Sequence, residues 1–462
     1  MSVSVQIPDL IPVMPEIVVT LAAVILLMLE LVVKNKNSLG IFAIAVSGLS
    51  LYILPQCQGE TFGGMFVNDT VSSYFKVIFL INLFLTVLIS LRYMQREKAE
   101  SGEYYGLLVF ATAGMMIMAS ARDFIVLYLG LELMALSTYI LAGIKRDDLK
   151  SNEAAIKYFL LGGFSSAMLL YGISLLYGLT ATTDIFKIGE FLKGTETTPA
   201  LLFAMALILA AFSFKIAAAP FHMWAPDVYE GAPTSVTAFM SIGPKAAGFA
   251  VIANVFFSAF HGLRADWAPL LIIISITTMA VGNILALTQT NIKRMLAYSS
   301  IAHAGYMLLG IIAGTEQGLY AMMTYLLIYA FMNMGAFGII VLMDKGDELK
   351  DYEGLAKSRP LVAALMLVFM FSLTGIPPTA GFIGKFNLFL AVVQAGYTWL
   401  VVVAVIFSAI SAFYYLRVVM NMYMKAMSEE AALSPSPFLS LALGIAVFAV
   451  FAIGVLPSLV IG

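Results

Sequence analysis

The sequence predicts an all-α polytopic membrane protein with about fourteen transmembrane helices. Hydrophobic residues make up 61% of the chain and charged residues only 11%, and the mean hydropathy is +0.96. Soluble domains are about 45–50% apolar and about 25% charged, so this composition lies far outside their range. Apolar runs separated by short polar breaks recur from Leu10 to Ile461, and each spanning helix needs about 20 such residues. We therefore predict a single membrane domain over residues 1–462.

Prolines are expected to interrupt two of the helices. Proline donates no backbone hydrogen bond, so Pro220 should break the seventh helix and Pro377-Pro378 the twelfth. Each break follows a Phe-Ser pair, and the two breaks lie five helices apart. A five-helix repeat would explain this echo, and because five is odd the two copies would be inverted in the membrane. The predicted helices are residues 10–34, 38–55, 71–91, 104–120, 122–143, 153–179, 199–223, 233–259, 267–287, 293–313, 316–343, 360–397 with a break, 398–424 and 436–460.

The distribution of lysine and arginine predicts that both termini lie on the outer side of the membrane. With the N-terminus outside, sixteen of these residues fall in or beside inner loops and four in outer loops, as the positive-inside rule requires. The inner loop after the seventh helix is an exception, because it carries Asp227 and Glu230 but no lysine or arginine. The sequence by itself offers no account of that loop.

Five lysines remain inside apolar runs, and they carry the functional argument. A charge near the bilayer centre costs about 3 kcal/mol on insertion scales, so such residues face the protein interior and usually mark ion or proton pathways. Lys76 and Lys157 lie about one turn inside their helices, where a long side chain can reach the interface. Lys157 also follows an acidic residue at the i,i+4 spacing of a surface pair. We therefore place these two near the membrane surface and assign transport to Lys215, Lys245 and Lys385.

Each of the three central lysines lies beside a helix breaker. A proline follows Lys215 by five residues, another directly precedes Lys245, and a Pro-Pro pair precedes Lys385. In a helix each proline frees a carbonyl four residues earlier, and irregular backbone in a membrane survives only where protein or water satisfies it. Discontinuous helices with charges at the break therefore point to a transport site. The alternative is an ordinary proline kink next to a lysine that has a partner.

Glu132 lies about ten residues into the fifth helix, close to the middle of the bilayer. A carboxylate at that depth needs a cationic partner, and the three central lysines are the candidates. If the distance between the carboxylate and the lysine increased, the lysine could release its proton. If the two groups came together again, the lysine would favour binding a new proton. This predicts a switch in which Glu132 and Lys215 approach each other directly or through water. The alternative is a static pair that only fixes helix packing.

His303 is a candidate proton relay, because imidazole accepts and gives protons near neutral pH; the alternative is a satisfied core histidine. The chain has three histidines and one cysteine, Cys57, and none has the spacing of metal or cluster ligands. A Gly-rich dinucleotide fingerprint is absent from the sequence, and a net charge of −2 does not favour nucleic acid. The sequence therefore predicts no metal and no cofactor on this chain, and chemistry done by side chains.

Long motifs resemble the antiporter-like subunits of the proton-pumping NADH-quinone oxidoreductases, the complex I family. Residues 215–234 resemble the helix-seven signature of that family, and the N-subunit form is especially close. Residues 154–162 and 375–386 also resemble family motifs, and the similarity runs over essentially the whole chain. The resemblance implies half-channels joined by a central hydrophilic axis. It implies helices one to three in 10–91, a first inverted repeat in 104–259, a second in 267–424 and helix fourteen in 436–460.

The resemblance also implies which residues move protons. Glu132 matches the helix-five glutamate of the family and Lys215 its helix-seven lysine, while Lys245 and Lys385 match the lysines of helices eight and twelve. Lysine at 385 separates the chain from the M-type relative, which has glutamate there. The L-type relative differs by its long lateral helix.

The family implies a proton-translocating subunit of a redox-driven enzyme, without a redox site of its own. Flavin and iron–sulfur clusters are expected in partner subunits that pass electrons from NADH to quinone. The implied partners are M-, K- and J-type neighbours, the lateral helix of the L-type subunit, protons and the lipid of the cell or inner membrane. Two other functions remain open: a subunit of an Mrp-type cation/proton antiporter, and a membrane scaffold whose buried charges only hold helices together.

Overall fold

The computed structural model describes residues 8–97, 99, 102–194, 196–343, 346–426 and 432–460. Within these ranges, eleven helices are long and apolar enough to cross a membrane, and three shorter apolar helices accompany them. The predicted all-α polytopic fold is confirmed, while the count of fourteen spans stays a prediction. The predicted side of the termini concerns residues 1–7 and 461–462, which lie outside the described ranges.

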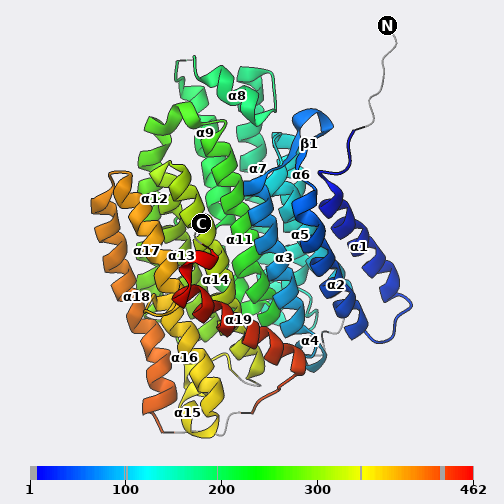
Figure 1. Ribbon diagram of the computed structural model, residues 1–462, viewed down its shortest axis with the longest axis vertical. Coiled ribbons are helices and arrows are strands. Elements are labelled where there is room, and N and C mark those ends of the chain that lie inside the picture. Colours follow the sequence, from blue (N-terminus) through cyan, green and yellow to red (C-terminus); the bar gives the residue numbers. More distant parts are fainter. Residues whose placement is uncertain are drawn as a thin grey trace.

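The chain runs through the bundle from its N-terminal helices, blue in Figure 1, to its C-terminal helices, orange and red. An antiparallel hairpin that the sequence did not predict joins the second and third helices; its strands are β1 (Gly59–Thr61) and β2 (Phe66–Asn68). The helices up to the middle of the chain are α1 (Met14–Glu30), α2 (Asn37–Ile53), α3 (Thr70–Ser90), α4 (Tyr93–Arg96), α5 (Glu103–Ser120), α6 (Phe124–Ala142), α7 (Leu149–Thr180), α8 (Ile185–Leu192), α9 (Pro199–Lys215), α10 (Trp224–Gly231) and α11 (Thr234–Phe257). The later helices are α12 (Arg264–Ala286), α13 (Ile292–Ala313), α14 (Glu316–Leu342), α15 (Leu355–Ser358), α16 (Pro360–Thr374), α17 (Ala380–Gln394), α18 (Thr398–Met424) and α19 (Pro437–Val455).

Side-chain caps explain where many of these helices begin. The Asp69 carboxylate accepts a hydrogen bond from the Ser72 N–H at the start of α3, and the Ser72 hydroxyl accepts one from the Asp69 N–H, both at 2.8 Å. This reciprocal arrangement is a capping box. Asp123, Thr198 and Asn291 cap α6, α9 and α13 in a similar way, although without the return bond. The caps satisfy N–H groups that the helix leaves free, so the site helices begin at defined positions.

The seventh helix is broken as predicted, but the predicted span 199–223 is too long because α9 ends at Lys215. Ala217 is left-handed, with φ 57°, and its N–H donates to the Phe214 carbonyl at 3.0 Å. The N–H of Ala218 donates to the Ser213 carbonyl at 2.8 Å. This pair of bonds is the Schellman motif that ends helices, and the chain resumes as the short helix α10.

The twelfth helix is also broken as predicted, into α16 and α17. Its break has the same local geometry: Gly375 is left-handed, with φ 91°, and the Ile376 N–H donates to the Phe371 carbonyl at 3.0 Å. A cis peptide bond precedes Pro220 in the first break and Pro378 in the second. In both breaks, backbone N–H groups just past the helix end satisfy two carbonyls of its last turn.

Pro244 behaves differently, because α11 continues through it. A proline inside a helix leaves the carbonyl four residues earlier without its usual donor. That carbonyl belongs to Met240, and it accepts a hydrogen bond from the Tyr229 hydroxyl at 3.2 Å. A side chain of α10 thus replaces the missing backbone donor.

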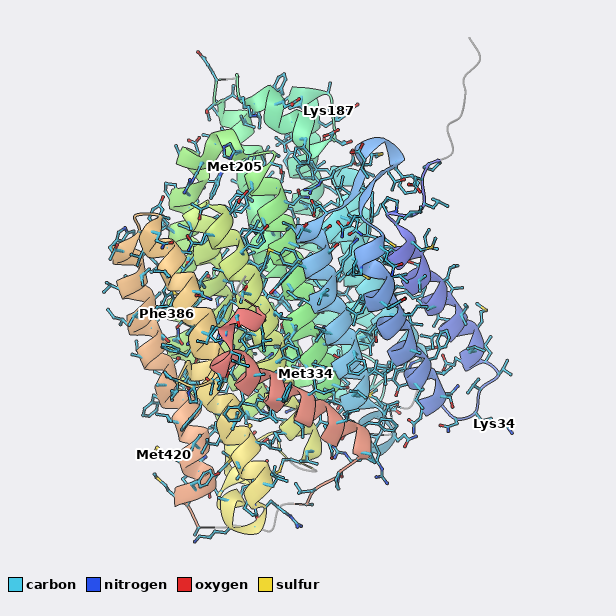
Figure 2. The ribbon with its side chains drawn as sticks, viewed as in Figure 1. Lys34, Lys187, Met205, Met334, Phe386 and Met420 are labelled. Carbon is cyan, nitrogen blue, oxygen red and sulfur yellow. The ribbon has the colours of Figure 1, made fainter. Side chains whose placement is uncertain are left out.

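The most buried helices lie at the centre of the bundle (Figure 1). In the apolar membrane-spanning part of α11 and of α13 every residue is buried, and in that of α14 89% of the residues are. In α18 and α19 only 33% of these residues are buried. Met334 of α14 lies among the central helices, and Lys34 and Lys187 project towards opposite ends of the molecule (Figure 2). Polar residues on α11, α13 and α14 are therefore removed from lipid and must find partners inside the protein.

Candidate functional site

Lys245 is buried between α11 and α13. Its Nζ donates a hydrogen bond to the Ser300 carbonyl at 2.6 Å and another to the Ser300 hydroxyl. Only 2% of the residue is exposed, and within the described ranges no carboxylate forms an ion pair with it. The lysine is therefore held by neutral acceptors, which allow it to lose its proton without leaving a buried carboxylate alone.

His303 lies one turn further along α13 and is bonded through both ring nitrogens. Nδ1 lies 2.7 Å from the Tyr325 hydroxyl of α14, and Nε2 lies 3.0 Å from the Tyr415 hydroxyl of α18. The Tyr415 hydroxyl also shares a hydrogen bond with the Ser299 hydroxyl. An imidazole with a hydroxyl at each nitrogen can accept a proton on one side while it donates one on the other.

Lys385 lies on the second turn of α17 and points back to the break. Its Nζ donates to the Thr374 carbonyl at 2.8 Å, to the Leu373 carbonyl at 3.2 Å and to the Ser408 hydroxyl at 2.9 Å. The break at Gly375 ends α16, so the carbonyls of its last turn lack helical donors. Lys385 supplies them, and this explains why a lysine and a broken helix occur together here.

The structure brings Lys245, His303 and Lys385 into one polar region. The ring of Tyr306 lies next to both His303, at 5.9 Å between ring centroids, and the Lys385 ammonium, at 5.2 Å from the ring centroid. The Tyr306 hydroxyl accepts a hydrogen bond from Asn283 at 3.1 Å. Among the described residues, direct hydrogen bonds run from Ser299 through Tyr415 and His303 to Tyr325, but none joins His303 to either lysine.

Lys215 and Glu132 lie in the other half of the chain. Lys215 ends α9, and its Nζ lies 6.0 Å from the ring centroid of Tyr139 and 5.8 Å from that of Phe214. Glu132 precedes Tyr139 by two turns on the same face of α6, and its Oε1 atom is buried without a hydrogen-bond partner. The two charged groups form no direct ion pair in the described structure, so of the two predicted forms of contact only the water-bridged one stays open.

The prediction that Lys76 lies at the membrane surface is wrong. Its side chain is fully buried, and Nζ lies 2.6 Å from the Glu16 carboxylate of α1 and 2.9 Å from the Asn68 amide oxygen. The strand β2 lies over this pair, with the Phe66 ring 5.1 Å from the ammonium. Depth along the helix predicted the opposite because the sequence does not show that a hairpin covers the helix end.

Lys157 is a surface residue, as predicted. Its side chain is 40% exposed and forms ion pairs at 2.7 Å with both Glu153 and Asp227. The first of these is the predicted i,i+4 pair. The second joins α7 to the short helix α10, which follows the first break.

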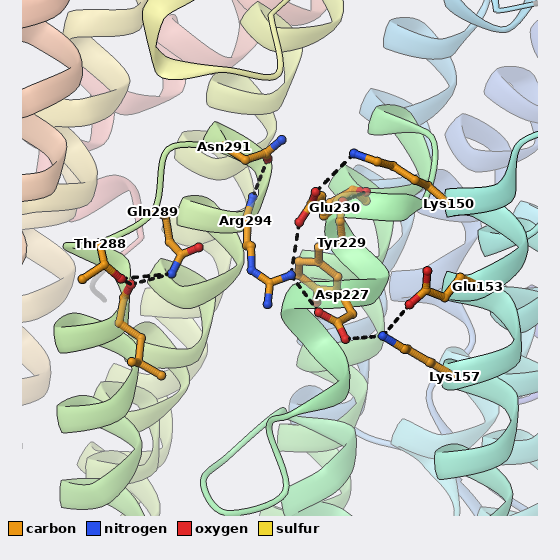
Figure 3. Close-up of polar contacts among 12 residues, drawn as sticks. Lys150, Glu153, Lys157, Asp227, Tyr229, Glu230, Thr288, Gln289, Asn291 and Arg294 are labelled. Carbon is orange, nitrogen blue, oxygen red and sulfur yellow. Dashed lines mark hydrogen bonds and ion pairs between the residues drawn. The ribbon is translucent and has the colours of Figure 1, made fainter.

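The acidic loop that lacked an explanation is neutralised by basic residues of other helices (Figure 3). Arg294 of α13 lies 2.7 Å from the Asp227 carboxylate and 3.1 Å from that of Glu230, and Lys150 of α7 lies 3.4 Å from Glu230. Burial alone would raise the pKa of Asp227, but hydrogen bonds from Lys157 and Arg294 outweigh it and hold the pKa below its usual value. The network therefore fastens α10 to α7 and α13 without any basic residue in the loop itself.

The tyrosines of the site were missed, because in an apolar run a tyrosine is more often a packing residue. Tyr325 and Tyr415 bond His303, and Tyr139 lies next to Lys215. The sequence offered only a weak signal, the i,i+4 spacing that puts Tyr325 and Tyr329 on one face of a helix. In the structure both rings lie near His303. Only the packing of α13, α14 and α18 shows that these hydroxyls meet the histidine.

The residues brought together supply proton donors and acceptors. Five helices contribute to these contacts: α11, α13, α14, α17 and α18. The ammonium groups of Lys245 and Lys385 each donate to a serine hydroxyl, and tyrosine hydroxyls contact the imidazole and a serine hydroxyl. Within the described ranges, no cluster of three or more His, Cys, Asp or Glu side chains could hold a metal ion. What this arrangement can do chemically is pass protons between neighbouring side chains.

Comparison with known proteins agrees with this chemistry. Residues 121–411 match the family described as "NADH:quinone oxidoreductase/Mrp antiporter, TM". NADH-quinone oxidoreductase subunit N of Trichlorobacter lovleyi is 51% identical over 90% of this chain and 88% of its own length, and subunit N 1 of Thermodesulfovibrio yellowstonii is 46% identical over 97% of both. A chain of respiratory complex I from Thermus thermophilus has the same fold, with a TM-score of 0.83, 34% identity and coverage of 97% and 98% of the two chains. The chain therefore belongs to the family of NADH:quinone oxidoreductase and Mrp antiporter transmembrane subunits.

Proposed function

We propose that this chain is a proton-translocating membrane subunit of a redox-driven NADH-quinone oxidoreductase. The similarity to subunit N relatives along almost the whole chain supports this, and so does the set of buried ionisable groups. Electron transfer from NADH to quinone is assigned to partner subunits, which would hold flavin and iron–sulfur clusters. The partners of this chain would be M-, K- and J-type membrane subunits and the lateral helix of the L-type subunit, in the cell or inner membrane with both termini outside.

The single observation that carries the proposal is His303, because both of its ring nitrogens contact a hydroxyl. In the proposed relay, Lys245 gives a proton towards Ser299 and Tyr415, His303 accepts it at one nitrogen and releases another from the second nitrogen. Lys385 receives it at the break of the twelfth helix. Two steps have no direct hydrogen bond, from Lys245 to Ser299 and from Tyr325 to Lys385. Water would complete them, since a proton moves only along continuous hydrogen bonds.

Glu132 and Lys215 are proposed to control this relay from the first half of the chain. The Lys215 ammonium lies over the face of the Tyr139 ring, and Glu132 lies two turns before Tyr139 on α6. A water-bridged approach of Glu132 would favour the protonated lysine, and a longer separation would favour release. The matching geometry of the two breaks, with left-handed Ala217 and Gly375, supports the proposed division into inverted repeats at residues 104–259 and 267–424.

Replacing His303 by Phe tests the proposal, because phenylalanine keeps a ring but has no titratable nitrogen. In the assembled complex, NADH-driven proton uptake by inverted membrane vesicles should fall at least about a hundredfold, the lower end of the contribution of general acid–base groups. The amount of complex in the membrane serves as the control. Proton uptake at the unchanged rate would refute a relay through His303.

The competing function, a subunit of an Mrp-type antiporter, has less support because the nearly full-length relatives described above are named as oxidoreductase subunits. The two functions differ in their driving force. Co-purification of the chain with NADH-oxidising activity would support the oxidoreductase, whereas sodium/proton exchange without NADH would support the antiporter.

A further inference from the structure

Four aromatic side chains outside the proposed relay lie in a row beside Lys215. They are Phe214 of α9, Trp224 of α10, Tyr158 of α7 and Tyr139 of α6, and all four are buried. The row, which we call the aromatic arc, therefore brings rings from four helices to one ionisable group.

Consecutive rings of the aromatic arc contact each other. Phe214 and Trp224 are stacked, with 5.3 Å between ring centroids and 29° between planes. Trp224 and Tyr158 are stacked more closely, at 4.5 Å and 7°, and Tyr158 meets Tyr139 edge to face at 4.6 Å. Stacks and right-angle pairs at these distances are the favoured geometries of aromatic rings. Because buried side chains are close-packed, a shift of one ring requires a shift of its neighbours.

Both ends of the aromatic arc face the Lys215 ammonium. Its Nζ lies over the Phe214 ring at 5.8 Å from the centroid and over the Tyr139 ring at 6.0 Å. The face of an aromatic ring is electronegative and attracts a cation within about 6 Å. Lys245 and Lys385 donate hydrogen bonds to carbonyls and serine hydroxyls, whereas within the described ranges the Lys215 ammonium has no hydrogen bond or ion pair. The two ring faces are therefore its printed contacts with the protein.

The charged group of the described residues that acts on Lys215 is Glu132 of α6, and the other titratable groups beside it are the two phenols of the arc. The neighbouring helix α11 presents Gly248, where an added Cβ would lie 3.6 Å from the Cβ of Lys215. The ammonium of Lys245, also on α11, is bonded to Ser300 instead. When the carboxylate is distant, the ring faces remain to stabilise the protonated lysine.

Trp224 is held in place at the centre of this arrangement. Its indole N–H donates to the Phe214 carbonyl at 3.0 Å. Trp224 begins α10, and Asp227, one turn later, forms an ion pair at 2.7 Å with Lys157 of α7 (Figure 3). Lys157 directly precedes Tyr158, so the ion pair and the ring stack join the same two helices. The position of α10 therefore sets the position of the indole.

We propose that Trp224 is a positioning residue that holds the two end rings of the aromatic arc against the Lys215 ammonium. It acts on the Phe214 ring directly and on the Tyr139 ring through Tyr158. The arc stabilises the protonated form of the lysine during the part of the cycle in which the carboxylate is distant. This inference rests on the proposed role of Lys215.

The pH dependence of NADH-driven proton uptake by inverted vesicles tests the inference, with Trp224→Leu in the assembled complex. Loss of the ring contacts removes stabilisation from the protonated lysine but not from the neutral one. The alkaline limit of uptake should therefore move to lower pH by roughly 0.5–1 unit. Trp224→Phe should keep the parent profile, because it retains a ring for both stacks and the Phe214 carbonyl keeps the Ala217 N–H as a donor at 3.0 Å.

The matched control is Trp267→Leu in α12. Trp267 is also buried, donates to the Phe260 carbonyl at 2.9 Å and meets the Phe256 ring edge to face at 5.4 Å. In the described part of the chain no ammonium lies over these rings, so we expect less assembled complex and an unchanged pH profile. An equal shift in Trp267→Leu would mean that lost packing alone moves the profile, and it would overturn the positioning role.

A combination of variants tests whether Trp224 acts through the end rings. In a chain that already carries Phe214→Leu and Tyr139→Leu, Trp224→Leu should bring no further shift. If Trp224→Leu does not assemble, Tyr158→Leu takes its place, because it breaks the arc in its middle and should shift the profile in the same direction. A parent-like profile in the assembled variant of this pair contradicts the positioning role.

Lys215→Ala separates the two proposals. Normal uptake by this variant would refute the proposed role of Lys215 itself. Lost uptake in Lys215→Ala together with a parent-like pH profile in Trp224→Leu would refute the positioning role alone.

Discussion

Replacing Lys385 by Arg separates a proton carrier from a fixed charge. Lysine can lose its proton when buried, whereas arginine stays charged at every accessible pH. The arginine side chain keeps several N–H donors for the carbonyls of Leu373 and Thr374 at the break. We therefore expect Lys385→Arg to assemble and to lose proton pumping.

The magnitudes follow from the contacts of Lys385. Its three hydrogen bonds have a charged donor, and loss of that donor in Lys385→Ala leaves two buried carbonyls unsatisfied at about 1–3 kcal/mol each. Lys385→Ala should therefore lower both the stability of the complex and pumping. In Lys385→Arg only the proton-transfer step is lost, which corresponds to about 10²–10⁴-fold in rate, or about 2.7–5.5 kcal/mol.

Proton uptake by inverted membrane vesicles, measured with NADH and normalised to the amount of assembled complex, distinguishes these outcomes. The matched control is Lys157→Arg, since that lysine forms a half-exposed ion pair and should tolerate arginine with normal pumping. Full pumping by Lys385→Arg would mean that the residue supplies a fixed charge and passes no proton, and the reasoning from its hydrogen bonds would be wrong.

Three further outcomes are expected. Lys76→Met should lower the unfolding free energy by about 3–5 kcal/mol because it strands the buried Glu16 carboxylate, and Glu16→Gln in the same chain should recover much of it; additive losses in thermal unfolding would contradict the pair. Because the pKa of Asp227 is lowered, its ion pairs stabilise the fold above pH about 4 and are lost as the pH falls below that value, so Asp227→Asn should flatten the dependence of unfolding temperature on acid pH; an equally steep dependence would exclude this residue. Gly381→Ala should prevent normal assembly, since its Cβ would lie 1.7 Å from a carbonyl oxygen of α16, whereas Gly163→Ala, which meets nothing within 4 Å, should assemble normally.

Features that depend on local chemistry could be predicted from the sequence. The apolar runs predicted the helices to within a few residues at most ends, and Pro220 and Pro377-Pro378 predicted the two breaks. The carbonyl that Pro244 would free was also predictable, although its donor, the Tyr229 hydroxyl, was not. Each of these follows from backbone hydrogen bonding, which a residue and its near neighbours determine.

Features that depend on which helices touch could not be predicted. The depth of Lys76 along its helix suggested the interface, but Glu16 and the hairpin enclose it. The sequence showed acidic residues around Asp227 without nearby basic residues. Their basic partners, Lys157 on α7 and Arg294 on α13, are distant in the chain and come together only in the fold.

By itself the sequence determined that the chain is a bundle of membrane helices with ionisable groups at defined breaks, because apolar length and proline act locally along the chain. Only the tertiary structure decided that the hydroxyls of Tyr325 and Tyr415 meet His303, and that Lys385 caps the last carbonyls of α16. These contacts join residues 11 to 112 positions apart. Such contacts arise because helices in a membrane must satisfy every polar group against another helix or water, and the partner is set by packing in three dimensions.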